Sequence, residues 1–88
     1  MTEQIVTVKN KLGLHARPAS QFIKTASKFK STIKVKKGEN TASAKSITNI
    51  LLLEIKMNDD ITISADGVDE KKAVKALVEL INSKFGEE

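Results

Sequence analysis

Residues 12–20 are LGLHARPAS, and across this stretch the hydrophobic pattern changes from that of a strand to that of a helix. Before it, the segment from Ile5 to Lys9 is short and β-branched, which favours a strand. After it, apolar residues recur every three or four positions, at Ala19, Phe22, Ile23, Ala26 and Phe29. The stretch therefore predicts a strand-to-helix connection, with a helix beginning near Ala16 and His15 at or beside its N-cap.

Two more strands are expected in the middle of the chain. Ile33 and Val35 alternate with lysines, which predicts a strand with one solvated face over Thr32 to Lys37. The next residues, KGEN, are typical of a hairpin turn, and they lead to a weaker strand over Thr41 to Ala44.

The last part of the chain predicts a short helix, a strand and a longer helix. Ser46 is placed to cap the short helix, which is dense in Ile and Leu, and Ile61 to Asp66 alternates as a strand does. Asp69 is placed to cap the final helix and Gly86 to end it. Its expected buried stripe is Ala73, Ala76, Leu77, Leu80 and Ile81.

These elements predict one domain over residues 1–88 with the order βαββαβα. Each strand has one polar face and each helix is apolar on one side, which is typical of a sheet covered on a single face. We expect an α+β fold, an open-faced β-sandwich in which a four-stranded antiparallel sheet carries three helices on one face.

The composition excludes several kinds of site. The chain has no cysteine and one histidine, so we expect no disulfide and no metal site. The first residues do not have the pattern of a targeting segment, and no apolar run approaches the length of a membrane span, so we expect a cytoplasmic protein without membrane insertion. The net charge of +4 permits anionic partners, either nucleic acid or an acidic protein surface.

An RNA-binding domain is the distant alternative for a small basic protein with an antiparallel sheet. Such domains stack bases on aromatic side chains carried by the strands. Here Phe22, Phe29 and Phe85 all fall on or at the end of predicted helices. We therefore expect no nucleic-acid partner.

His15 stands where a helix is expected to begin, and the residues beside it suit an anion. Imidazole is nucleophilic near neutral pH, and the planar guanidinium of Arg17 matches phosphate oxygens. The first N–H groups of a helix lack intrahelical acceptors and attract phosphate. Pro18 is tolerated in this first turn because the N–H that it lacks would have had no intrahelical acceptor. A histidine in this position is also commonly a plain capping or surface residue, and position alone leaves that alternative open.

The segment GLHARPA at 13–19 resembles the active-site signature of the HPr family, the histidine phosphocarriers of the bacterial phosphoenolpyruvate:sugar phosphotransferase system. AKSI at 44–47 is similar to the regulatory segment of that family, and ITISADG at 61–67 is similar to its last strand. The resemblance covers essentially the whole chain.

That resemblance implies a phosphocarrier rather than an enzyme, with no cofactor. His15 would accept a phosphoryl group on Nδ1 from phosphorylated enzyme I and pass it to enzyme IIA domains. Arg17 would orient the phosphate, with the backbone N–H groups of Ala16 and Arg17 as a cradle. The chain would act as a monomer.

Ser46 has two interpretations that do not exclude each other: a helix cap, and the regulatory site that HPr kinase/phosphorylase modifies in relatives. The short helix after it has apolar residues in too many directions for one core. We expect Ile50 and Leu53 to be buried, with Ile47, Leu51 and Leu52 forming an exposed patch beside His15. The expected partner-binding residues are Ser20, Lys24, Lys45, Ile47, Thr48, Asn49 and Leu51.

The same segment departs from the sugar-type pattern. Thr48 and Asn49 replace residues that are usually larger or basic, or a glycine, and Glu54 stands where the family commonly has glycine. Three segments together are similar to the nitrogen-related branch of the family, NPr: LLE at 52–54, NKLG at 10–13 and NSKF at 82–85. An NPr-like regulatory phosphocarrier is therefore the main alternative.

Overall fold

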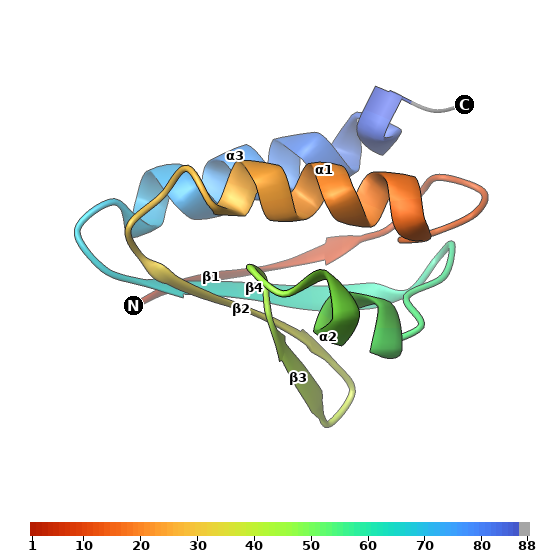
Figure 1. Ribbon diagram of the computed structural model, residues 1–88, viewed down its shortest axis with the longest axis horizontal. Coiled ribbons are helices and arrows are strands. Elements are labelled where there is room, and N and C mark those ends of the chain that lie inside the picture. The colour runs from red at the N-terminus through yellow and green to blue at the C-terminus, as the bar shows by residue number, and fades with distance from the viewer. Residues whose placement is uncertain (87–88) are drawn as a thin grey trace.

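The structure is a computed structural model that describes residues 1–86, and it contains a four-stranded antiparallel sheet and three α-helices (Figure 1). The strands lie in the order β1-β4-β2-β3. Along the chain the elements are β1 (Thr2–Thr7), α1 (Ala16–Ala26), β2 (Thr32–Lys37), β3 (Asn40–Ser43), α2 (Ile47–Leu52), β4 (Asp60–Asp66) and α3 (Glu70–Asn82). The predicted α+β class and element order are confirmed.

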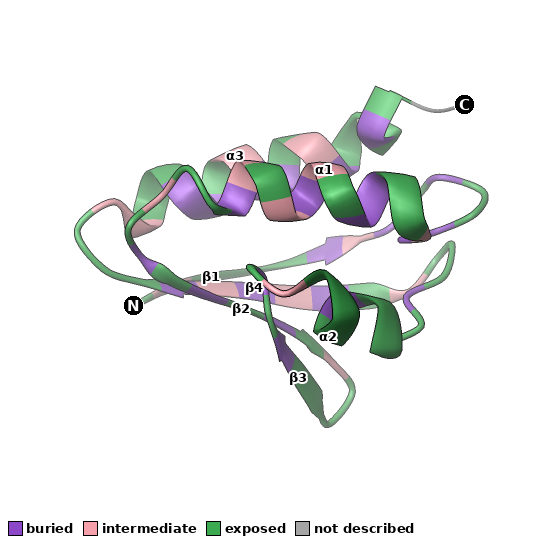
Figure 2. Ribbon diagram, in the orientation of Figure 1, coloured by how far each residue is buried: buried purple, intermediate pink, exposed green. Residues whose placement is uncertain are grey.

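The helices α1 and α3 lie side by side over one face of the sheet, and α2 packs against α1 and β3 (Figure 1). Buried residues line the sides of the helices and strands that face each other (Figure 2). They form one mainly aliphatic core in which Phe22, Ile50 and Leu77 are fully buried. Ile50 is the buried residue of α2, and Leu53 at the end of the helix packs partly against the same core.

The opposite face of the sheet carries no helix, and we call it the open face. The strand register aligns Glu3, Ser64, Lys34 and Ser43 in one row across it, and Ile5, Thr62, Lys36 and Thr41 in the next. Both rows are mainly polar, as expected where side chains of an antiparallel sheet meet water. The predicted open-faced architecture is therefore present.

The first strand begins earlier than its β-branched residues predict. It spans Thr2–Thr7 instead of Ile5 to Lys9, because its register with β4 pairs Thr2 with Ala65 and Thr7 with Asp60. Ile5 points to the open face and is 67% exposed, whereas Val8 beyond the strand is buried. The third strand is likewise displaced by one residue, to Asn40–Ser43, because Lys37 pairs with Asn40 across the hairpin.

Three expectations about α3 need correction. Asp69 occupies the N-cap position, but its side chain makes no cap hydrogen bond. Ala76 and Leu80 are half-buried, and Val74 and Val78 take fully buried places that the predicted stripe missed. The helix ends at Asn82 with Ser83 as C-cap, so Gly86 belongs to a separate short turn, Lys84–Gly86.

The longest helix that the structure describes, α3, has 13 residues. Within residues 1–86, no helix combines the length and the apolar character needed to cross a membrane.

Candidate functional site

His15 is the N-cap residue of α1, as predicted, and it is half-buried. Its backbone is extended, with φ −77° and ψ −174°, and its carbonyl accepts the N–H of Ala19 at 2.9 Å. The imidazole makes no cap hydrogen bond to the helix. The interpretation of His15 as a capping side chain is therefore wrong, since its backbone alone begins the helix.

The first turn of α1 presents N–H groups next to His15. The intrahelical hydrogen bonds begin with the N–H of Ala19, so the N–H groups of Ala16 and Arg17 precede them and have no acceptor within the helix. Pro18 is buried against the core and contributes no N–H. Two backbone donors and the exposed side chain of Arg17 thus surround the start of the helix.

The residues before His15 approach another part of the chain closely. Gly13 has φ +63°, and a Cβ placed there would lie 2.4 Å from the carbonyl oxygen of Ile55 and 2.7 Å from the Cα of Lys56. The N–H of Leu14 donates to that same Ile55 carbonyl at 3.0 Å. The turn that leads into α1 is therefore fixed by the loop between α2 and β4, and only glycine fits at residue 13.

Ser46 is the N-cap residue of α2, as predicted, and its Oγ accepts the N–H of Asn49 at 3.4 Å. The hydroxyl is half-buried, with the exposed residues of the helix directly after it. The cap is long for a hydrogen bond, so its contribution belongs at the lower end of the usual range for serine caps.

The outer side of α2 exposes apolar side chains, as predicted. Ile47 and Leu51 are each 38% exposed and Leu52 is 73% exposed, whereas Ile50 is fully buried and Leu53 packs partly against the core. Thr48 and Asn49 are exposed between them. Since α1 packs against α2, the exposed residues of both helices border the same part of the surface.

Leu12 is a candidate docking residue that the sequence reasoning missed. It lies three residues before His15 and is 71% exposed. The signal was available, because an apolar residue between Lys11 and Gly13 in a turn has no core to enter.

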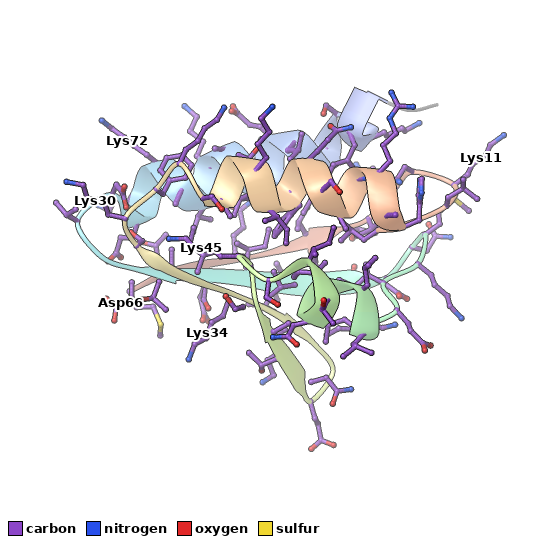
Figure 3. The ribbon with its side chains drawn as sticks, in the orientation of Figure 1. Lys11, Lys30, Lys34, Lys45, Asp66 and Lys72 are labelled. Atoms are coloured by element: carbon purple, nitrogen blue, oxygen red, sulfur yellow. The ribbon has the colours of Figure 1, made fainter. Side chains whose placement is uncertain are left out.

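The two lysines expected near this surface differ in their contacts. Lys24 is exposed on α1, next to Ser20 on the same side of the helix. Lys45 donates through Nζ to the carbonyl of Phe29 at 2.8 Å and to that of Ser31 at 3.1 Å. Its side chain therefore lies below α1, directed toward the connection between α1 and β2 (Figure 3), and its ammonium group is already bound.

The end of α1 is joined to the start of α3 by a carboxylate. Asp69 accepts the N–H of Lys30 at 2.8 Å, the N–H of Ser31 at 3.0 Å and the hydroxyl of Ser31. The hydroxyl of Ser31, then the N–H of Lys30, hold the pKa of Asp69 below its ordinary value. Asp69 thus stabilises the α1–β2 connection rather than capping its own helix.

A second carboxylate fixes the loop that touches Gly13. Asp59 accepts the N–H of Lys56 at 2.8 Å and pairs with the ammonium of Lys37 at 3.0 Å. Those two contacts, in that order, lower the pKa of Asp59. The Nζ of Lys37 also donates to the carbonyl of Glu54 at 2.7 Å, so β2 secures both ends of this loop.

A surface depression lies away from His15. A depression of about 540 Å³ is lined by the residues from Gly67 to Lys72, at the start of α3, and includes no residue of α1 or α2. Within residues 1–86, no group of three or more histidine, cysteine or acidic side chains could hold a metal ion. The arrangement can bind an anion at the start of α1 and dock a partner over α1 and α2.

Comparisons with known proteins agree with one another. The sequence profile described as "PTS HPr component phosphorylation site" matches residues 2–83. The chain is 42% identical to the phosphocarrier protein HPr of Neisseria meningitidis, over 99% of this chain and 98% of that protein. It is also 42% identical to the phosphocarrier protein NPr of Shewanella violacea, over 97% and 93%. The structure is similar to that of HPr-C-His from Thermoanaerobacter tengcongensis, with a TM-score of 0.97 and 52% identity over 100% and 99% of the two chains.

Proposed function

The chain belongs to the HPr family, whose members carry phosphoryl groups between enzyme I and enzyme IIA of the phosphotransferase system, and from this premise we propose that His15 carries the phosphoryl group here. The protein is a phosphorylated intermediate of that relay rather than a catalyst. The observation that supports His15 most directly is its place at the start of α1, with an imidazole that does not cap the helix.

In the proposed reaction, the lone pair of His15 Nδ1 forms a bond to phosphorus. The bond between phosphorus and the donor breaks, and its electron pair stays with the donor, so no oxidation or reduction occurs. Nε2 keeps its hydrogen. The protein supplies position and charge, which are the main requirements of phosphoryl transfer.

In this proposal, Arg17 and the backbone N–H groups at the start of α1 stabilise the negative charge of the phosphate. The guanidinium is exposed and fixed in charge, and its fork matches two phosphate oxygens. The N–H groups of Ala16 and Arg17 add the positive end of the helix dipole. Because Pro18 provides no third donor, the phosphate is held loosely enough to be passed on.

The proposed docking surface consists of the exposed parts of α1 and α2. Its residues are Ser20, Lys24, Lys45, Ile47, Thr48, Asn49 and Leu51. Exposed apolar side chains supply the buried area of a transient interface, and Lys24 favours an acidic partner. Lys45 belongs to this set by position, and docking through its ammonium group would require its bonds to Phe29 and Ser31 to break.

Regulation through Ser46 is part of the proposal. Its half-buried hydroxyl lies at the start of α2, directly beside the docking residues, and we propose that HPr kinase/phosphorylase modifies it. We also propose that the protein acts as a monomer in the cytoplasm. The proposed phosphate site is built by one chain, and the cytoplasm is the compartment typical of this family.

The decisive experiment is phosphorylation by enzyme I with labelled phosphoenolpyruvate. Wild-type protein should take up label that is labile in acid and stable in base, as phosphohistidine is. His15→Ala should take up none, because His15 is the only histidine in the chain. Label on the His15→Ala protein would contradict the assignment.

Sugar-type phosphotransfer is our principal proposal, and the nitrogen-type branch is the second candidate. The second is favoured by the similarity to NPr of Shewanella violacea and by Glu54 in place of the usual glycine. The two candidates can be distinguished by measuring the rate at which a sugar-type and a nitrogen-type enzyme I, at equal concentration, phosphorylate this protein. Faster phosphorylation by the nitrogen-type enzyme would favour the second candidate.

A further inference from the structure

We propose that Asn10 is a positioning residue for phosphoryl transfer at His15. This inference rests on the proposed role of His15. Asn10 does not reach the phosphate in this proposal. It holds the turn from which His15 projects, so that the imidazole meets the phosphorus of the incoming donor in line.

Asn10 closes this turn with two hydrogen bonds. Its side chain is fully buried, and its Nδ2 donates to the carbonyl of Gly13 at 2.6 Å. Its own carbonyl accepts the N–H of Gly13 at 3.1 Å. Burial of an amide is costly unless it is bonded, so the geometry of residues 10–13 is tied to the orientation of this one side chain.

The residues on both sides of the turn are bonded to the loop between α2 and β4. On one side, the N–H of Val8 donates to the carbonyl of Asp59 at 2.9 Å, and the carbonyl of Val8 accepts the N–H of Asn58 at 2.7 Å. On the other, Leu14 is bonded to Ile55 and is only 4% exposed. Five residues lie between these anchors, and within them Asn10 bonds to Gly13 and so helps to shape the turn.

The turn lies at one end of the molecule, where Lys11 points outward into solvent (Figure 3). Lys11 and Leu12 are exposed, so they do not pack against the core. The hydrogen bonds of Asn10 and the close approach of Gly13 to Ile55 together hold the Gly13 carbonyl in place before α1.

Leu14 joins this turn to His15 along the chain. The imidazole projects from the extended backbone of His15, with φ −77° and ψ −174°, so the conformation at residues 13–15 contributes to the direction in which it projects. Phosphoryl transfer is sensitive to the alignment of attacking atom and phosphorus, and a displacement of about 1 Å can cost on the order of a hundredfold in rate. Asn10 therefore acts on the chemical step and leaves the docking residues of α1 and α2 in place.

The test measures the protein as a substrate of enzyme I, with separate values of kcat and KM. Asn10→Ala removes the donor to Gly13, and we expect kcat to fall about tenfold or more while KM stays within about twofold. The matched control is Val74→Ala, a core substitution in α3 at a residue that is 2% exposed. It should lower the melting temperature by a similar or larger amount and leave kcat within about twofold of wild type.

Two further variants keep the result interpretable if Asn10→Ala folds poorly. Asn10→Asp keeps the shape of the side chain, but when ionised it has no proton to donate to the Gly13 carbonyl, and Asn10→Ser leaves a smaller group. A folded variant with wild-type kcat would overturn the inference. So would an effect confined to KM, or a loss of kcat that Val74→Ala reproduces. Failure of all three variants to fold would assign Asn10 to folding alone.

The same assay separates this inference from the proposed function. If wild-type protein takes no acid-labile label, the role of His15 itself fails. If wild type is labelled, His15→Ala is not, and Asn10→Ala behaves as wild type, only the positioning role fails.

Discussion

Arg17 is exposed beside the proposed phosphate site, so its part in transfer can be separated from folding. We expect Arg17→Ala to unfold within about 1 kcal/mol of wild type, as exposed substitutions usually do. Phosphate acceptance should slow at least tenfold, about 1.4 kcal/mol in the barrier, because a fixed positive charge is lost. Urea denaturation and initial rates with enzyme I measure the two effects.

Arg17→Lys is the control, since it keeps the charge and removes the planar fork. An intermediate rate would assign part of the effect to paired hydrogen bonds with phosphate oxygens. Wild-type rates in both variants would remove Arg17 from the mechanism.

Glu54 adopts a left-handed backbone conformation, with φ +51°, a conformation that favours glycine. This conformation costs a residue with a Cβ roughly 1 kcal/mol or more. Glu54→Gly should therefore raise stability by about 0.5–1 kcal/mol, after the extra entropy of glycine in the unfolded chain is subtracted. Its carbonyl still accepts from Lys37.

The control for this prediction is Glu54→Ala, which removes the carboxylate and keeps the Cβ. It should leave the melting temperature close to that of wild type. A gain shared by both variants would show that charge rather than backbone conformation limits stability at residue 54.

At this scale, the sequence predicted where His15 and Ser46 lie, because both follow from local helix-start signals. It did not predict that Lys45 binds the carbonyls of Phe29 and Ser31, or that Asp69 binds Ser31. Those partners are 14 to 38 residues away in sequence, and no local pattern encodes which distant carbonyl or hydroxyl a side chain will meet.

The element that joins regulation to docking is α2, six residues long with Ser46 at its start. Ser46→Asp keeps an acceptor at the cap position, so the protein should remain folded. Phosphate acceptance from enzyme I should slow, because a negative charge beside Ile47 and Leu51 opposes an acidic partner. The deficit should shrink as salt screens the charge.

Ser46→Ala is the matched control, with a lost cap and no added charge. It should cost roughly 0.5–1 kcal/mol of stability and leave the rate at low salt near that of wild type. A Ser46→Asp protein that melts early, or that transfers at the wild-type rate in low salt, would show that Ser46 is only a helix cap.

The amphipathic pattern of α2 was informative for its two faces, since Ile50 is buried and Ile47 and Leu51 are exposed as predicted. The limits of β1 were less predictable. Strand ends depend on the partner strand, and the register with β4 draws Thr2 and Glu3 into the sheet although glutamate does not favour a strand.

For the molecule as a whole, three acidic side chains join segments that are distant in sequence. The hydroxyl of Thr2 is the main group that lowers the pKa of Glu70 to about 2, and the pKa values of Asp69 and Asp59 are lowered by the contacts described above. In the unfolded chain the same groups titrate near 4.5 and 3.8. As pH falls, the unfolded state therefore binds protons first, and the folded state loses stability.

The urea midpoint should accordingly be constant with respect to these groups above about pH 5 and should fall steadily between about pH 5 and pH 2. Asp69→Asn should be less stable than wild type at pH 7 and should lose less on acidification, because one of the three groups no longer titrates. Parallel curves for the two proteins would contradict the role assigned to Asp69.

The overall architecture was predictable because each element carries its own periodicity and only one layered arrangement buries every apolar side. The order of the strands in the sheet was not predictable, because it depends on which strands pair with each other and no local pattern encodes that pairing. Contacts between distant segments also hold the turn before His15, where Gly13 lies against the backbone of Ile55.

The open face has a practical consequence for measurement. Thr62 lies in the middle of it, between Ile5 and Lys36, on the side of the sheet away from α1 and α3. Since the chain has no cysteine, Thr62→Cys would give the protein one thiol. Molecules tethered to a sensor chip through that thiol would all be attached by the same face. The helix α1 would lie on the side of the sheet away from the chip, so binding rates would report a single orientation.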